Sequence, residues 1–292
     1  MVNRKIYFAD YKSEAHNWIT LAGGEYYPDV LKDAVELYTP VLVVFGQLLK
    51  KSHSATHLFE QVCELKEQWI RIQLARIFRK YVSPDLPVEM LKKKTQVQDI
   101  CQRFSKSFRP INEVQRAFLS RPLADEVICA LLWEYKDRGK KGYDLTERLF
   151  NLLAIQLPTL TLKGPQRAGK DVLMKEIFED YPNPKRPVDF VIYEGERVLA
   201  IGLARYDGDR GGAQEDDRTG GYTNCADEIL NYAKSKHPKL KLIFVNDGPG
   251  LLLGSMWDDY ANLENRTDWQ DKIMVTTLRM IPDRLTLTWL KS

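Results

Sequence analysis

Hydrophobic residues recur every three to four positions through much of the first half of the chain, which predicts a mainly helical region over residues 29–157. Residues 55–81 show the pattern most clearly, and Ser83-Pro84-Asp85 ends it. Further helices are predicted at residues 88–94, 97–104, 111–119, 123–136 and 143–157. This spacing is typical of amphipathic helices that bury one face.

The pattern changes after Pro158, where short apolar runs bounded by turn residues predict strands. These strands are expected at residues 159–162, 188–193, 198–204 and 240–245, with a further apolar run at 273–276. Helices are predicted between them at residues 170–178, 224–234 and 251–263. The alternation predicts an α/β (α+β) fold with a mixed sheet. We therefore divide the chain into a helical region, 1–157, a candidate for DNA binding or dimerisation, and an α/β core, 158–292.

The composition is that of a soluble globular protein, with 44% hydrophobic and 28% charged residues. The longest apolar stretch, residues 38–49, is about half the length of a transmembrane helix, and the charged first residues do not resemble a signal peptide. The cysteines are scattered without metal-ligand spacing: Cys63, Cys101, Cys129 and Cys225. We expect a cytoplasmic protein with reduced thiols and no membrane partner.

The formal net charge is only +3, so charge alone neither requires nor excludes a nucleic-acid partner. Positive residues are concentrated in the first half, at residues 92–94, 103–109 and 136–141. Such clusters can follow phosphates, but a charge run is more often the solvated face of a helix.

The candidate chemistry centres on Asp189, which opens the predicted strand 188–193. Acids at the ends of neighbouring strands can hold Mg²⁺ and leave coordination positions for water and a phosphate. Asp171 and Glu176, on the segment before that strand, are candidates for a further acid of the same cluster. Asp171 is the second candidate metal ligand, and Glu176 a candidate catalytic residue.

A glycine-rich loop, predicted over residues 207–222, follows the second strand of the hairpin. Glycines let the backbone approach a ligand closely, and Arg and Gln suit the edges of guanine and adenine. A disordered surface loop would have a similar composition. At the predicted start of helix 170–178, two further cations are placed to meet phosphates. The candidate DNA contacts are Arg167, Lys170, Arg205, Arg210, Gln214 and Arg218.

Three segments in the second half resemble the MboI-type restriction endonucleases, a group of the PD-(D/E)xK nucleases that cuts GATC sites. They are the DFVI run at 189–192, the VLAI run at 198–201 and the segment IFVNDGPG at 243–250. Between them lies the glycine-rich loop. The resemblance covers residues 160–265 in order and spacing, and the helical first half matches only in kind.

The resemblance implies that Asp189 is the first metal-binding acid. It also implies that Gly202 stands where the family has its catalytic Glu, and Ala204 where it has Lys, Asn, Gln or Glu. The active site would then lack a ligand. Three explanations compete: an inactivating Glu→Gly change, a naturally degenerate DNA-binding protein, or replacement by an acid such as Asp207. The first is favoured because Gly weakens a strand, and it predicts that Gly202→Glu creates or restores Mg²⁺-dependent cleavage.

A competing interpretation rests on residues 164–171, GPQRAGKD, which almost match a Walker A motif and would make the chain a P-loop-like NTP-binding enzyme. Residues 242–247 would then be the Walker B strand. Asp171 stands where the motif requires Ser or Thr, and Pro165 removes a phosphate-binding amide. A third interpretation is a non-catalytic, sequence-specific DNA-binding protein.

The interpretation that accounts for most of these features is a type II restriction endonuclease of a restriction-modification system. It would hydrolyse phosphodiesters at a short site in double-stranded DNA with Mg²⁺ as cofactor. A homodimer is expected, because two-fold protein symmetry matches a palindromic site.

Overall fold

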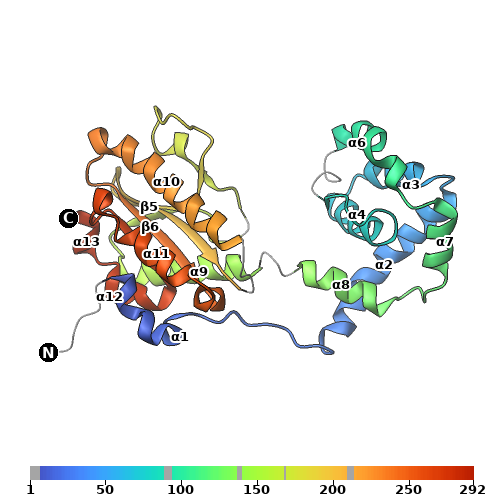
Figure 1. Cartoon of the computed structure of the whole chain (residues 1–292), viewed down its shortest axis with the longest axis horizontal. Coiled ribbons are helices and arrows are strands. Elements are labelled where there is room, and N and C mark those ends of the chain that lie inside the picture. Colours follow the sequence, from blue (N-terminus) through green and yellow to red (C-terminus); the bar gives the residue numbers. More distant parts are fainter. Residues whose placement is uncertain (1–6, 89–93, 137–139, 168, 209–213) are drawn as a thin grey trace. The chain divides into compact units, whose positions relative to one another are not determined.

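A computed structural model describes the chain except for residues 1–6, 89–93, 137–139, 168 and 209–213 (Figure 1). The chain forms two compact units: Gly24–Arg138, and a second unit made of Met1–Gly23 together with Gly139–Ser292. The first unit is helical and the second is mixed α/β, which confirms the predicted fold class. None of the described helices combines the length and apolarity that a membrane crossing requires.

The helical unit follows the predicted periodicity closely. Its α-helices are α2 (Val30–Lys51), α3 (Ala55–Glu64), α4 (Gln68–Tyr81), α6 (Val97–Phe104), α7 (Ile111–Leu119) and α8 (Glu126–Lys136). Short 3-10 turns, η2 (Lys94–Gln96) and η3 (Ser105–Ser107), flank α6. The predicted helix 55–81 is divided in two, because Arg71 of α4 donates to the carbonyls of Leu65 and Lys66 at 2.7 and 2.8 Å and so stabilises the break between α3 and α4.

The core of this unit consists of the apolar faces of α2, α3, α4, α6, α7 and α8. Aromatic rings fill its centre, with Phe59, Phe78 and Phe108 in mutual contact at centroid distances of 5.3–6.2 Å. The burial of these rings, rather than intrinsic helix propensity, holds such short helices together.

The α/β unit is built on a five-stranded mixed sheet in the order β1-β4-β5-β6-β7. The strands are β1 (Thr161–Lys163), β4 (Phe190–Glu194), β5 (Arg197–Tyr206), β6 (Lys241–Asp247) and β7 (Ile273–Thr276). β1, β4 and β5 are antiparallel neighbours, whereas β5, β6 and β7 are parallel. A second, two-stranded sheet joins β2 (Val172–Leu173) to β3 (Pro187–Val188). The hairpin predicted between β4 and β5 is confirmed, with Gly195 at a φ of 60° in its turn.

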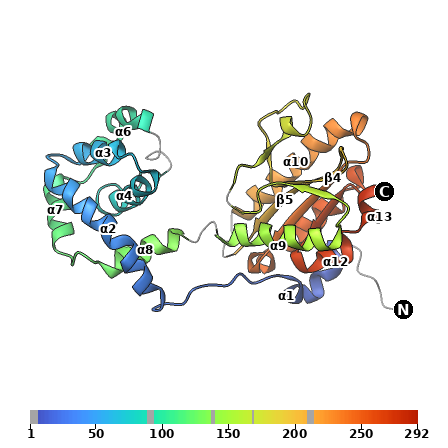
Figure 2. The same ribbon diagram turned by 180° about the vertical axis from the view of Figure 1, so that it is seen from behind.

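Helices cover both faces of the large sheet (Figure 2). On one face lie α9 (Lys140–Gln156), α12 (Ile281–Arg284) and α13 (Leu287–Lys291). On the other lie α10 (Gln214–Lys236) and α11 (Met256–Glu264). Along β6, Leu242 and Phe244 face α10 while Ile243 and Val245 face α9. A strand buried on both faces needs an unbroken apolar run, which is what the sequence shows at this point.

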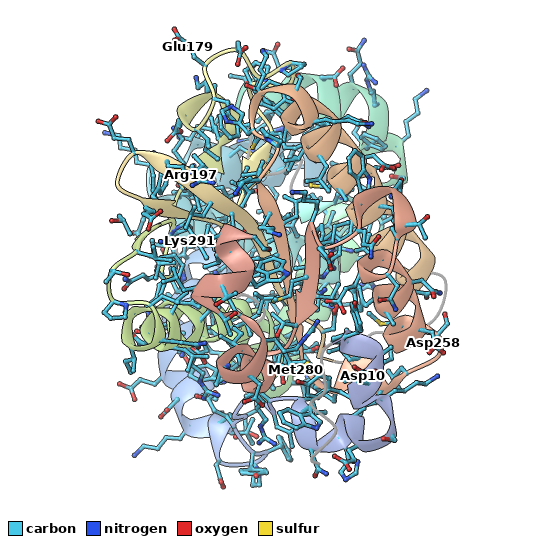
Figure 3. The ribbon with its side chains drawn as sticks, turned by 90° about the vertical axis from the view of Figure 1, so that its left-hand side faces the viewer. Asp10, Glu179, Arg197, Asp258, Met280 and Lys291 are labelled. Carbon is cyan, nitrogen blue, oxygen red and sulfur yellow. The ribbon has the colours of Figure 1, made fainter. Side chains whose placement is uncertain are left out.

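The first residues of the chain belong to the α/β unit, which corrects the predicted boundary at 157. A 3-10 helix, η1 (Phe8–Glu14), packs against α11 and leads into α1 (Ala15–Trp18), and Asp10 and Asp258 in Figure 3 mark where η1 meets α11. The Phe8 amide donates to the buried carboxylate of Glu264 at 2.5 Å. α9 also belongs here, because its apolar side packs on the sheet. The periodicity of α9 resembles that of the helical unit, so the sequence pattern alone could not assign it.

The remaining predictions for this unit have mixed outcomes. The helix expected at 170–178 is wrong: the segment contains β2 and the 3-10 turn η4 (Met174–Glu176). The predicted helix 251–263 is a turn, η5 (Pro249–Leu252), followed by α11. Another 3-10 turn, η6 (Thr267–Trp269), precedes β7, and η7 (Leu278–Met280) follows it. The apolar run 273–276 is confirmed as β7.

Candidate active site

Asp189 lies at the junction of the two sheets, between β3 and β4. Its carboxylate Oδ2 accepts a hydrogen bond from the backbone amide of Ala204 at 2.7 Å, and its own amide donates to the carbonyl of Gly202 at 3.1 Å. Phe190 and Gly202 are the last paired residues of β4 and β5 at this end. The Asp189 carboxylate therefore takes the place of a backbone carbonyl as the acceptor for the Ala204 amide, where the pairing of β4 with β5 ends. This hydrogen bond to the β5 backbone fixes the orientation of the carboxylate.

Asp171 lies at the same end of the small sheet as Asp189. Val172 of β2 pairs with Val188 of β3, and the two acids flank this pair, Asp171 preceding Val172 and Asp189 following Val188. Burial raises the pKa of the Asp189 carboxyl, the bond from the Ala204 amide opposes that effect, and the negative charge of Asp171 adds to it. The two predicted metal ligands are thus brought together, with one carboxylate exposed and the other partly enclosed.

Position 202 is filled by a neighbouring ring and is not a vacant ligand position, which corrects the interpretation of Gly202. A Cβ atom added to Gly202 would lie 1.9 Å from Cζ of Phe190. Phe190 in turn meets Phe150 of α9 edge-on at 6.5 Å in the core on that face of the sheet. A Glu at 202 would have to displace Phe190 and enter this apolar layer. Glycine is present because the ring crosses directly over the β5 backbone.

Ala204 contributes its backbone amide to Asp189 and packs its methyl group at the α9 core. Glu176, in η4, forms an ion pair with Lys163 of β1 at 3.5 Å. The predicted helix would have placed Glu176 near the metal acids, but the segment pairs with β3 instead. Asp171 is therefore the acid next to Asp189.

The structure separates the candidate DNA contacts into described and undescribed groups. Arg167 forms an exposed ion pair with Glu147 of α9 at 2.6 Å, and Lys170 is exposed next to Asp171. Arg210 lies outside the described residues. Gln214 and Arg218 lie in α10, so the predicted loop ends earlier than expected, and their side chains are not among those described.

Arg205, the remaining candidate, is half-exposed on β5, with its Nε 3.4 Å from Oδ1 of Asp207. The side chain of Asp207 is only 1% exposed. Asp207 is poorly placed to act as a substitute metal acid, because its carboxylate faces this guanidinium. Arg205 is thus paired with a buried acid near the end of β5.

Tyr222 and Asn246 form a buried polar contact that the sequence did not reveal. The Tyr222 hydroxyl donates to Oδ1 of Asn246 at 3.1 Å. Burial raises the pKa of Tyr222 well above its ordinary value; the Tyr260 hydroxyl adds to this, Arg205 opposes it, and the charges of Asp207 and Asp189 raise it further. The charges of Asp189, Arg205 and Asp207 therefore all act on the hydroxyl of Tyr222, a buried residue of α10. Tyr222 ends the glycine-rich stretch, which was its only signal in the sequence.

The NDGPG segment, residues 246–250 at the end of β6, serves the fold. The carboxylate of Asp247 accepts from the amides of Thr20 at 2.6 Å, Gly248 at 2.7 Å and Leu278 at 3.0 Å. Gly248 has a φ of 111°, and an added Cβ would lie 2.4 Å from the carbonyl oxygen of Asp207. Asp247 therefore joins three separate segments, and its oxygens are occupied by backbone donors.

This arrangement gives no support to the P-loop interpretation. An added Cβ at Gly164 would lie 2.3 Å from the carbonyl oxygen of Asp189, so this glycine permits β1 and β4 to approach each other. β2 follows the segment 164–171, where a phosphate-binding loop would open a helix. The predicted Walker B acid, Asp247, is enclosed as described above.

A metal at this site would have two carboxylates from the protein. Within the described residues, no group of three or more His, Cys, Asp or Glu side chains gathers to hold an ion. Mg²⁺ is often bound by one or two carboxylates and keeps its other positions for water and phosphate oxygens. The Asp171–Asp189 pair fits that donor set, since a cation would offset both the burial of the Asp189 carboxylate, the main cause of its raised pKa, and the smaller effect of the Asp171 charge.

Comparisons of the chain with protein-family models, with curated proteins and with solved structures give no match.

Proposed function

We propose that this chain is a Mg²⁺-dependent nuclease that cuts double-stranded DNA at a short specific site, as a type II restriction endonuclease does. The observation that carries the proposal is the juxtaposition of Asp171 and Asp189 at one end of β2 and β3. Burial chiefly, and the charge of Asp171 in addition, raise the pKa of Asp189, and a perturbed acid beside a second acid supports assignment of a functional site.

The roles of the residues follow from their positions. Asp171 and Asp189 would hold the ion, and the Ala204 amide fixes the orientation of the Asp189 carboxylate. When bound, Mg²⁺ supplies Lewis-acid polarisation of the phosphodiester. Arg205, paired with Asp207, provides a positive charge at the end of β5, where it can bind a phosphate oxygen. Lys170 adds an exposed cation beside Asp171.

Recognition of a specific site is the part of the proposal that rests on the resemblance to MboI-type enzymes. A palindromic site would be read most simply by a homodimer. Sedimentation of the chain with and without duplex DNA tests this separately from cleavage, and a 1:1 complex on a palindromic duplex would contradict the dimer.

The decisive experiment is cleavage of plasmid and phage DNA with Mg²⁺ by the wild-type chain and by Asp171→Asn and Asp189→Asn. Glu176→Gln is the matched control, because it also neutralises an acid of the same segment but one that pairs with Lys163. We expect discrete fragments from the wild type and from the control, and none from the two Asp variants or in EDTA. Cleavage by Asp189→Asn at the wild-type rate would overturn the assignment of Asp189 as a metal ligand.

A second readout measures ion binding without cleavage. Mg²⁺ or Ca²⁺ should raise the unfolding temperature of the wild type and have little effect on Asp189→Asn, because a ligand stabilises only the state that binds it. The alternative function, a non-catalytic sequence-specific DNA-binding protein, is favoured by the presence of only two acids in the described part of the site. Tight binding to one duplex without cleavage at any divalent concentration would establish it.

A further inference from the structure

A narrow groove on the helical unit is lined by three cations. Arg76, Arg79 and Lys80 of α4 form one side, and Tyr135 of α8 contributes its ring. Pro84 and Val88 complete the lining. The cavity measures about 60 Å³, far below the roughly 300–1,000 Å³ of sites for drug-sized organic ligands. It has room for a single small group such as a phosphate.

Hydrogen bonds and a ring contact orient the two guanidinium groups at the groove. Arg79 donates from Nε and Nη2 to the carbonyl of Pro84 at 3.2 and 2.8 Å. Arg76 donates from Nη1 to the Gln73 side chain at 3.0 Å and stacks over Tyr135 at 4.8 Å. Fixed donors lose less conformational entropy when an anion binds. Among the described residues that line the groove, none is acidic.

The distribution of charge between the two units also favours a polyanion as the partner of the helical unit. The unit Gly24–Arg138 carries the whole formal net charge of +3, while the α/β unit is formally neutral. No acid lies within α4 itself, but three acids adjoin lining residues of the groove in sequence: Asp85 follows Pro84, Glu89 follows Val88 and Glu134 precedes Tyr135. A strip of cations spaced three and four residues apart on one helix suits a row of phosphates.

We infer that the groove formed by Arg76, Arg79, Lys80 and Tyr135 binds the phosphate backbone of duplex DNA. The inference rests on the proposed function for the choice of DNA as the polyanion. It assigns to the helical unit a sequence-independent contribution to affinity, since phosphate contacts position a protein on DNA without reading its bases. The Asp171–Asp189 site would then act on DNA that the helical unit helps to hold.

The test measures binding of a fluorescently labelled duplex by the full chain in EDTA, over a range of NaCl concentrations. The triple variant Arg76→Gln/Arg79→Gln/Lys80→Gln should bind more weakly. The slope of log K against log [salt] should fall by about 0.9 for each phosphate that the variant no longer neutralises, or about 2–3 in total. Asp85→Asn should tighten binding modestly, because it removes a negative charge next to the groove.

The matched control, Lys50→Gln/Lys51→Gln/Lys106→Gln, removes three exposed positive charges elsewhere on the same unit. An unchanged slope in the control and a reduced slope in the groove variant support the inference. Equal losses in both variants would show that bulk charge is responsible and would overturn it, as would no loss in either. The double variant Arg79→Gln/Lys80→Gln keeps the Arg76–Tyr135 contact and serves if the triple variant unfolds.

Because EDTA prevents cleavage, this experiment separates the two proposals. If the groove variant binds the duplex as tightly as the wild type does, only the proposal for the groove is overturned. No duplex binding by the wild type at low salt overturns the groove proposal but not the nuclease proposal, because EDTA removes the Mg²⁺ that would offset the charges of Asp171 and Asp189. Mg²⁺-dependent cleavage together with unchanged affinity of the groove variant would leave the nuclease proposal standing alone.

Discussion

The ring of Phe190 lies directly over the backbone of Gly202, so that a Cβ atom at position 202 would come within 1.9 Å of the ring. The two residues are also paired across β4 and β5. The glycine in this strand is therefore explained by packing, and the same relationship determines what substitution there will do.

Gly202→Ala should lower the free energy of unfolding by about 1–3 kcal/mol, the usual cost of overpacking a core. Urea denaturation measures the change. Gly221→Ala in α10 is the control, because an added Cβ meets nothing within 4 Å there, and Ala is favoured over Gly in a helix by about 1 kcal/mol. Gly202→Ala should cost less in a Phe190→Ala background. Equal effects at 202 and 221 would contradict the packing argument.

The Asp189 carboxyl should make the stability of the metal-free protein depend on pH. Its pKa is raised above the ordinary value of 3.8, because of burial first and of Asp171 in addition, while the Ala204 amide opposes the rise. An acid with a raised folded pKa contributes stability below its unfolded pKa and loses that contribution as pH rises through the folded value. The unfolding free energy of the wild type relative to Asp189→Asn should therefore fall as pH increases above 3.8.

Asp171→Asn should narrow the pH range over which the unfolding free energy falls, because it removes the negative charge that adds to the raised pKa of Asp189. Urea titrations in EDTA at a series of pH values provide the measurement, and a difference that stays constant with pH would refute the coupling. Adding Ca²⁺ at neutral pH should stabilise the wild type more than either variant.

Lys241 should produce a pH dependence at the opposite end of the scale. Burial lowers its pKa from 10.5 to about 8, assisted by the charge of Lys272. The ammonium donates to the carbonyl of Asp271 at 2.8 Å and to the Ser292 hydroxyl at 2.9 Å, which are neutral acceptors. A base with a lowered folded pKa contributes stability above its unfolded pKa and loses it as pH falls through the folded value.

The unfolding free energy should therefore rise between pH 8 and 10.5, and Lys241→Met should remove most of that rise. Denaturant titrations at intervals through this range test the prediction, with Lys239→Met, at an exposed lysine, as the control. A wild-type profile that is flat, or unchanged by Lys241→Met, would show that the ammonium is not buried as described.

Asp247→Ala should destabilise the α/β unit strongly, because three amide donors lose one acceptor group. Each buried donor left without a partner costs about 1–3 kcal/mol. Asp247→Asn retains one carbonyl oxygen and should cost less. Hydrogen exchange should accelerate at the amides of Thr20 and Leu278, and addition of ATP should rescue neither variant. Exchange that stays slow at Thr20 would show that the first segment is held by other contacts.

The sequence by itself determined the elements whose signals are local. Helical spacing located α2, α3, α4, α6, α7 and α8, while most of the helix predicted at 88–94 lies outside the described residues. Unbroken apolar runs located β6 and β7, and Glu194-Gly195-Glu196 located the hairpin turn. The fold class follows from this alternation, and Asp171 and Asp189 could be named as candidate metal ligands because carboxylates suit Mg²⁺, a role that stays a prediction. Periodicity and turn chemistry act between residues a few positions apart, so the chain displays them directly.

The tertiary structure decided what depends on contacts between distant segments. Val172 pairs with Val188, which converts a predicted helix into a strand and brings Asp171 to Asp189. Phe8 reaches Glu264 and places the first residues in the α/β unit, while Phe190 occupies the space at Gly202. Burial and cross-strand pairing involve partners far apart in sequence, and their free energies override local propensity. Local signals therefore named the two candidate acids, and long-range strand pairing brought them to the same end of the small sheet.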